Sequence, residues 1–190
     1  SISSSDYKSD KISSPAYDAR ANFTKQGTMR SKGFEGMTCS VAAVMGAIGD
    51  RWAMLIMRDL ILGLTRYDDL QRSTGVTNAT LSDRLKLLEQ NGLAERRQYQ
   101  VRPDRYEYVP TEKGRDLGLL MQAMVQVGDK WNRADPSGPP LRFVDERSGH
   151  AVKLAPVDVE TGAPVAVEHI KARPGSGADD LTRWRLSHRP

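Results

Sequence analysis

The side chains best suited to chemistry are polar and basic groups gathered between residues 77 and 105. Hydroxyls and amides can hydrogen-bond the edges of nucleic-acid bases, and arginine or lysine can pair with guanine or phosphate. The first group has the spacing of one helix face: Thr77, Asn78, Thr80, Ser82, Arg84 and Lys86. The second group is more basic: Arg96, Arg97, Arg102 and Arg105, with Arg66 as a further backbone contact. Together they predict a surface that binds double-stranded DNA.

Two helices and a turn would position the first group. Residues 67–72 are expected to form a short helix, residues 73–75 the turn, and residues 78–90 a second helix whose N-cap is Thr77. Opposite its polar groups, the second helix carries an apolar stripe of Leu81, Leu85 and Leu88. Short polar side chains at the start of such a helix are what a helix that enters the major groove needs.

Two strands would position the second group. Residues 93–100 and 105–110 alternate well enough to predict an antiparallel pair, joined by a basic loop at residues 101–104. A basic loop of this kind can follow the phosphate backbone and supply salt-dependent affinity. The order of helix, turn, helix and strand pair is typical of a winged helix-turn-helix.

Helices are also expected on both sides of this unit, at residues 39–48, 51–62 and 112–131. The last carries more apolar surface than one edge of a small domain needs, which favours pairing with a second copy of the chain. The alternative is a helix packed entirely on its own domain. The residues expected in the dimer interface are Val41, Met45, Leu117, Leu120, Met121, Met124, Val127 and Trp131.

The predicted fold class is α+β, mainly α: a winged helix-turn-helix with N- and C-terminal dimerisation helices and a small β-rich C-terminal appendage. Residues 1–36 are expected to be a flexible polar tail, and residues 37–132 the DNA-binding and dimerisation domain. Residues 138–178 would form the β-rich extension, with short strands at 141–145, 151–154 and 165–173. Residues 179–190 would be a C-terminal tail containing a short helix at 179–186.

Composition narrows the functional classes. The net charge of +4 and the isoelectric point of about 9.3 favour a polyanionic partner only weakly. No apolar run reaches the ~18–20 residues of a membrane span, and no signal peptide is evident, so a cytoplasmic protein is expected. One cysteine and three dispersed histidines give no metal site. With no glycine-rich phosphate loop and no recognisable catalytic set, neither a cofactor nor enzymatic activity is expected.

The segment from Cys39 to Trp131 contains an ordered set of short motifs. They are Cys39-Ser40-Val41-Ala42, Ile48-Gly49-Asp50-Arg51-Trp52, Leu55-Ile56-Met57-Arg58-Asp59-Leu60, Tyr67-Asp68-Asp69-Leu70, Leu81-Ser82-Asp83-Arg84-Leu85, Glu89-Gln90-Asn91-Gly92-Leu93, Tyr106-Glu107-Tyr108, Thr111-Glu112-Lys113-Gly114 and Gly128-Asp129-Lys130-Trp131. With these motifs the segment resembles the HxlR family of bacterial winged-helix regulators. The resemblance implies homodimers that bind palindromic operators, often as repressors, with the first and last helices of the core at the dimer interface.

Two further features follow from the resemblance. In several members a cysteine at the position of Cys39 senses oxidants or electrophiles; here Cys39 would lie near a helix N-terminus, which can increase thiol reactivity. The alternative is a small side chain buried at the dimer contact. In some members the C-terminal extension has cysteine pairs that suggest a zinc ribbon, but Ser148-Gly149-His150 and Thr161-Gly162 offer no thiols at the corresponding places.

The expected function is therefore that of a sequence-specific DNA-binding transcriptional regulator. It would act as a homodimer, in the manner of a repressor, and could respond to a small molecule or to a thiol-reactive signal. The alternative is a winged-helix protein-interaction or architectural module without a sequence-specific operator. These two differ in whether the protein recognises a defined duplex sequence.

Overall fold

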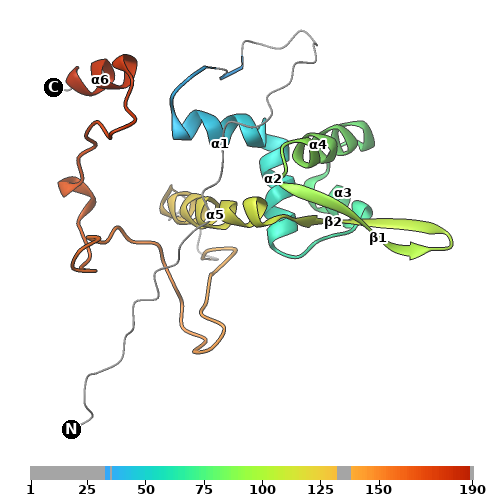
Figure 1. Ribbon diagram of the computed structural model, residues 1–190. Helices are drawn as coiled ribbons and strands as arrows, with labels where there is room; N and C mark the ends of the chain where they lie inside the picture. The colour runs from blue at the N-terminus through green and yellow to red at the C-terminus, as the bar shows by residue number, and fades with distance from the viewer. Residues whose placement is uncertain (1–32, 35, 132–137, 189–190) are drawn as a thin grey trace. The chain divides into compact units, whose positions relative to one another are not determined.

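A helix-turn-helix and a two-stranded wing lie between flanking helices (Figure 1). The computed structural model describes residues 33–34, 36–131 and 138–188, so most of the predicted tail at residues 1–36 lies outside the described residues. The predicted class, an α+β and mainly α winged helix-turn-helix, is confirmed. Its elements are α1 (Ser40–Ile48), α2 (Arg51–Ile61), α3 (Tyr67–Thr74), α4 (Asn78–Gln90), β1 (Ala94–Val101), β2 (Asp104–Pro110), α5 (Glu112–Trp131), the 3-10 turn η1 (Val167–His169) and α6 (Asp180–Ser187).

The helix boundaries follow from local capping. The Asp50 carboxylate accepts hydrogen bonds from the backbone N–H groups of Trp52 and Ala53, both at 3.0 Å, and so begins α2. Thr77 begins α4 in the same way, accepting from Thr80 N at 3.2 Å. Gly75, with φ of +66°, ends α3 in the left-handed conformation that glycine adopts without steric cost. These caps set the tight turn between α3 and α4.

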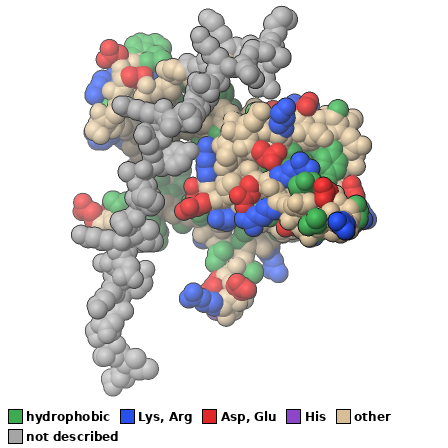
Figure 2. All heavy atoms as spheres, turned by 45° about the vertical axis from the view of Figure 1, so that its right-hand side comes forward, with side chains coloured by type: hydrophobic (Ala, Val, Ile, Leu, Met, Phe, Trp, Pro, Cys, Tyr) green, Lys and Arg blue, Asp and Glu red, His purple; other side chains and the backbone are tan. Residues whose placement is uncertain are grey.

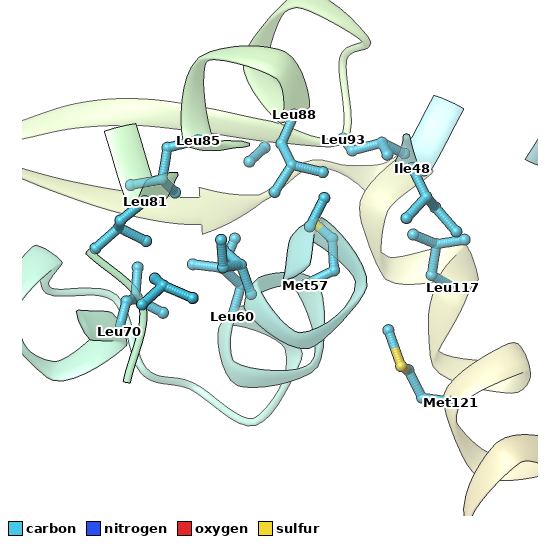
Figure 3. Close-up of a cluster of buried hydrophobic side chains, with 14 residues drawn as sticks. Ile48, Met57, Leu60, Leu70, Leu81, Leu85, Leu88, Leu93, Leu117 and Met121 are labelled. Atoms are coloured by element: carbon cyan, nitrogen blue, oxygen red, sulfur yellow. The ribbon is translucent and has the colours of Figure 1, made fainter. Parts of the chain in front are cut away.

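The core is built around α2, which contacts α3, α4, α5 and β2. Ile56, Met57 and Leu60 of α2 are fully buried, and they pack in one cluster with the leucine stripe of α4 (Figure 3). Burying each such side chain contributes about 1.5–3 kcal/mol relative to leaving it exposed. The predicted stripe is confirmed: Leu81, Leu85 and Leu88 are each at most 1% exposed.

The N-terminal half of α5 also belongs to this core. Leu117 and Met121 are only 7% and 8% exposed and lie in the cluster with Ile48 (Figure 3). Both residues were predicted to contact a second copy, but their own domain covers most of each side chain. Leu120 is half-buried against the same core. The helical spacing identified an apolar face of α5, but it did not show whether the chain's own domain or a second copy covers that face.

Close backbone packing joins α5 to the residue before β1. A Cβ atom added to Gly114 would overlap the carbonyl oxygen of Leu93 and lie 3.1 Å from Met57 Cε. The Thr111 hydroxyl donates to Gly92 O at 2.6 Å and accepts from Gly114 N at 3.0 Å. The start of α5 is thereby held against the end of the helix-turn-helix.

The wing is an antiparallel ladder from Ala94↔Pro110 to Val101↔Asp104, one residue longer toward the tip on each strand than predicted. Its register shifts between Gln98 and Gln100, which leaves Tyr99 as an extra residue in β1. Such a bulge redirects the side chain that it carries.

The junction between α1 and α2 is attached to α4. Asn91, at the end of α4, donates from Nδ2 to Ala47 O at 2.7 Å. Arg84 Nε donates to Asp50 Oδ2 at 2.6 Å, so the N-cap of α2 is ion-paired with α4. A Cβ at Gly49 would overlap the Leu87 side chain. The end of α1 and the helix α4 therefore form one packed unit.

Residues 138–188, which we call the C-terminal arm, differ from the predicted β-rich extension. Of the first two expected strands only the isolated bridge Val144↔Ala151 is present, and residues 165–173 contain the 3-10 turn η1 instead of a strand. A second isolated bridge, Val157↔Pro164, lies outside the expected strands. Each bridge spans a short turn closed by the carboxylate of Asp145 or Asp158. The predicted C-terminal helix is present as α6, with Asp179 as its N-cap.

Within the described ranges, no single helix is long and apolar enough to cross a membrane. The α1–α2 pair passes that test together by length and composition, but it is bent by 83°.

Candidate nucleic-acid interface

The N-terminal turn of α4 is the polar end of the recognition helix. Thr77, Asn78 and Ser82 are exposed there, while Thr80 is half-buried and its hydroxyl lies 3.0 Å from that of Thr77. Lys86 lies exposed one turn beyond Ser82. These side chains share one end and face of the helix, where base edges and phosphates can be reached.

A tyrosine of α3 fixes this turn. The Tyr67 hydroxyl donates to Asn78 O at 2.9 Å, and the Ser82 hydroxyl lies 2.9 Å from it. Because the single proton of Tyr67 is used on Asn78, Ser82 must donate to the tyrosine oxygen. The ring of Tyr67 contacts the core cluster. Its hydroxyl, which holds the recognition helix, was missed.

Arg84 differs from the other predicted residues of this helix. Its guanidinium is ion-paired with Asp50, the N-cap of α2, and its side chain is only 27% exposed. Partial burial opposes ionisation of Asp50, but hydrogen bonds from Ala53 N, Arg84 and Trp52 N outweigh it and hold the pKa of Asp50 below its ordinary value. In this arrangement Arg84 positions α4 and does not present a free charge to DNA.

The wing arginines divide into two sets. Arg96 lies over the Tyr106 ring, 3.6 Å from its centroid, and Arg97 is ion-paired with Glu95. Arg102 and Arg105, at the tip, are exposed and have no ion pair or ring contact to another described residue. Basic and acidic side chains are interspersed on the side of the molecule that Figure 2 brings forward. The two tip arginines are therefore the freest positive charges of the wing.

Arg66 joins the wing to the helix-turn-helix. Its guanidinium stacks on Tyr99, 3.2 Å from the ring centroid, and lies 3.8 Å from Glu107 Oε2. Thr65 strengthens the same contact, donating its hydroxyl to Glu107 at 3.1 Å and accepting from Tyr108 N through its carbonyl at 2.8 Å. Arg66 was predicted as a backbone contact for DNA, but its Nη1 atom is buried and has no hydrogen-bond partner among the described residues. Arg66 therefore connects the start of α3 to β1, and we call its contact with Tyr99 the clamp.

The clamp could not be read from the sequence. Tyr99 reaches Arg66 because it occupies the β-bulge, and an alternation pattern does not reveal an extra residue in one strand. The only available signal was a tyrosine on each strand of a predicted wing next to basic residues.

The remaining predicted interface residues lie on α1 and on the second half of α5, and they are exposed. Val41 and Met45 are 66% and 54% exposed, and Trp131 is 80% exposed. Met124 and Val127 are also exposed. Unlike Leu117 and Met121, these side chains have no cover in the described part of the chain.

Cys39 is the N-cap residue of α1, which agrees with the prediction that it lies near a helix N-terminus. Its thiol is free and half-exposed, and it makes no capping hydrogen bond. The described residues contain no group of three or more histidine, cysteine, aspartate or glutamate side chains that could hold a metal ion.

A recognition helix with a free polar end, followed directly by a wing with basic residues at its tip, defines a winged helix-turn-helix DNA-binding protein. The family model described as HxlR-like helix-turn-helix matches residues 47–136. Relatives described below share at least 30% identity over most of their length. The chain belongs to the HxlR family, and it is a helix-turn-helix transcriptional regulator.

Rv3095 of Mycobacterium tuberculosis, an uncharacterized HTH-type transcriptional regulator, is 33% identical over 144 residues, which is 76% of this chain and 89% of that protein. The crystal structure of PA1607, described as a candidate transcription factor, superposes with a TM-score of 0.66 at 32% identity. The structure of PA1374 from Pseudomonas aeruginosa superposes with a TM-score of 0.55 at 34% identity. The two matches cover 76% and 78% of this chain and all of those chains. Because 144 residues exceed the part that precedes residue 138, the similarity to Rv3095 extends into the arm.

Proposed function

We propose that this regulator is a homodimeric repressor that binds a palindromic operator and places one α4 in the major groove of each half-site. The observation that carries the proposal is the N-terminal turn of α4, where exposed polar groups are fixed by the Tyr67 hydroxyl. A helix held in this way offers base-reading groups in a defined orientation. Occupancy of an operator that overlaps a promoter is sufficient for repression.

The contacts of each side chain suggest a division of roles. Asn78 and Ser82 are proposed to meet base edges, whereas Thr77 and Lys86 are proposed to meet phosphates beside the helix N-terminus. Arg102 and Arg105 would follow the backbone of the flanking DNA. Arg66, Arg84, Arg96 and Arg97 already have partners within the protein, so they are proposed to shape the interface more than to neutralise phosphate.

The dimer is proposed to form through α1 and the second half of α5. The apolar stripe of α5 begins in the core with Leu117 and Met121 and continues to Met124 and Trp131, where it is exposed. The nine-residue α1 contains no charged residue and buries only Ala42 and Ile48. A two-fold pairing of these surfaces would cover the exposed part of the stripe and give two recognition helices for two half-sites.

The test is enrichment of the purified full chain on random duplexes at two salt concentrations, followed by sequencing of the retained DNA. An enriched palindrome supports the proposal. Salt-sensitive binding without enrichment would favour an architectural module instead, and no binding would favour a protein-interaction module. On the enriched operator, the Arg102→Gln/Arg105→Gln variant should bind more weakly and with a salt slope smaller by about 1–2. Arg97→Gln is the control, because Arg97 is already paired with Glu95.

The regulator is further proposed to respond to thiol-reactive compounds through Cys39. The half-exposed thiol lies at the start of α1, so an adduct there would add bulk at the edge of the proposed dimer surface. Cys39→Ser should keep operator affinity and lose any change in affinity caused by a quinone or by hypochlorite. A variant that still responds would exclude Cys39 as the sensor.

A further inference from the structure

The two strands of the wing are attached to the helix-turn-helix in different ways. Strand β2 is attached through the backbone: Arg66 forms an isolated antiparallel bridge with Glu107, and Thr65 O accepts from Tyr108 N at 2.8 Å. Strand β1 is attached through the clamp, in which the Arg66 guanidinium lies 3.2 Å from the centroid of the Tyr99 ring. Tyr99 comes two residues before the end of β1, so the clamp acts close to the tip of the wing.

The outer part of the wing is connected from the bulge to the tip. Gln98 and Gln100 flank Tyr99 in the sequence. Gln98 Nε2 donates to Asp104 Oδ1 at 2.9 Å, and Gln100 Nε2 donates to Arg102 O at 2.8 Å. These bonds link the residues on both sides of the bulge to the turn at the tip. A displacement of Tyr99 would therefore be passed on to Arg102.

Arg66 is held on two sides, so it gives Tyr99 a fixed support. The ring of Tyr99 covers one side of the guanidinium, and the carboxylate of Glu107 lies 3.8 Å from Nη1. The Thr65 hydroxyl donates to the same carboxylate at 3.1 Å and so holds Glu107 in place. Because Nη1 is buried, Arg66 does not offer this atom to a phosphate. The contacts of Arg66 suit a support for the wing.

We propose that Tyr99 is a positioning residue for DNA binding, because its stacking on Arg66 holds the wing tip at a fixed place relative to α4. This inference rests on the proposed function and adds to it a residue that need not touch DNA. Arg102 and Arg105 at the tip then meet phosphates when α4 enters the groove. A wing that is already held in place avoids the entropic cost of being ordered on binding.

The test is binding of the full chain to the enriched operator over a range of salt concentrations. Tyr99→Leu removes the ring and should weaken binding about three- to tenfold, with a salt slope smaller by about 1. Tyr99→Phe keeps the ring and should restore both values. Tyr106→Leu is the matched control, because it removes the stack with Arg96, 3.6 Å from the ring centroid, whose two members both lie in the wing. Its salt slope should equal that of the wild type.

A double-mutant cycle separates positioning from a general loss of stability. When Arg102→Gln/Arg105→Gln has removed the tip charges, adding Tyr99→Leu should change the affinity by less than about twofold, since no tip charge remains to be positioned. An equal loss in both backgrounds would overturn the inference, because Tyr99 would then act independently of the tip. Full affinity and an unchanged salt slope in Tyr99→Leu would also overturn it.

A measurement without DNA distinguishes this inference from the proposed function. Cys39→Ser removes the one cysteine, and spin labels at Lys86→Cys and Arg102→Cys then report the distance from α4 to the wing tip. Labelled chains are diluted with unlabelled protein, so that only distances within one protomer are measured. Tyr99→Leu should broaden the distance distribution, whereas Tyr106→Leu should not. An unchanged distribution would overturn the role of Tyr99; broadening in a chain that binds no duplex would support that role and overturn the proposed function alone.

Discussion

A single hydroxyl, that of Tyr67, links the two helices of the helix-turn-helix at their DNA-facing end. It is hydrogen-bonded to the backbone of Asn78 and to the Ser82 side chain, in the first two turns of α4. The ring of Tyr67 packs on the core, so the core fixes the position of the hydroxyl. The position of the groups proposed to read the bases therefore depends on one residue that need not touch DNA.

Tyr67→Phe should weaken operator binding about three- to tenfold, because a net hydrogen bond is worth about 0.5–1.5 kcal/mol and its loss releases the α4 turn. Fluorescence anisotropy on the enriched operator measures the change. Tyr99→Phe is the matched control: it keeps the ring over Arg66, and the Tyr99 hydroxyl has no hydrogen-bond partner among the described residues. An equal loss in both variants would show that the Tyr67 hydroxyl has no special role.

Asp50 gives the fold a pH dependence of known sign. Its pKa is lowered in the folded state, so the carboxylate contributes stability that is present above the unfolded value of about 3.9. That contribution is lost as the pH falls through the lowered folded pKa. Asp50→Asn keeps a good N-cap but removes the charge facing Arg84, so it should flatten the acid side of the stability profile below about pH 4.

Urea denaturation between pH 7 and pH 2.5 provides the measurement. Asp50→Ala also removes the cap of α2 and should cost a further 0.5–2 kcal/mol, roughly, at neutral pH. The other carboxylates with lowered pKa values, Asp145, Asp158 and Asp179, lie in the arm and remain in every variant. An acid profile of Asp50→Asn that is parallel to the wild-type profile would contradict the assignment.

At the scale of elements, α5 is attached by close approach to the residue that precedes the wing. Gly114→Ala should destabilise the protein by about 1–3 kcal/mol or more, because the new methyl group overlaps the Leu93 carbonyl and neither backbone can move freely. Gly118→Ala, one turn later, meets no atom within 4 Å and should raise stability by about 0.5–1 kcal/mol through helix propensity. Chemical denaturation at pH 7 compares the pair. Opposite signs are expected, and equal effects would refute the packing argument.

The sequence predicted the elements well where local signals agree. The helix α4 has the predicted bounds, because Thr77 caps it at one end and Asn91-Gly92 ends it at the other. The prediction failed where the outcome depends on a partner in space. Strands were expected at residues 141–145, 151–154 and 165–173, but no neighbouring strand pairs with these segments, and the structure has only the isolated bridge Val144↔Ala151 there. The periodicity of α5 could not tell Leu117, which is buried in its own domain, from Met124, which is exposed.

The candidate site shows the same limit. The polar residues of α4 and the basic wing were found from residue type and spacing, which are local properties. The pairing of Arg84 with Asp50, and of Arg66 with Tyr99, joins residues more than 30 positions apart in the sequence. No spacing rule relates such residues, so only the fold distinguishes arginines that position the interface from those free to meet phosphate.

At the scale of the whole molecule, a single charged substitution in the exposed second half of α5 tests the proposed dimer. Met124→Glu should raise the dimer dissociation constant at least about a hundredfold, because the unpaired carboxylate would have to be buried in the proposed interface of α1 and α5. Leu119→Glu is the control, since Leu119 is 66% exposed and lies on the opposite side of α5 from Leu117. Analytical ultracentrifugation of both variants measures the dissociation constants. A Met124→Glu protein that dimerises like the wild type would show that the second half of α5 is not in the dimer interface.

The attachment of α4 to the α1–α2 junction has a consequence for the DNA itself. The Asn91–Ala47 hydrogen bond and the Arg84–Asp50 ion pair make each recognition helix move with the end of α1 on its own protomer. In a dimer that pairs through α1, the angle between the two copies of α1 therefore sets the distance between the two recognition helices. The number of base pairs separating the half-sites of an operator would then be determined by a helix that never reaches the groove.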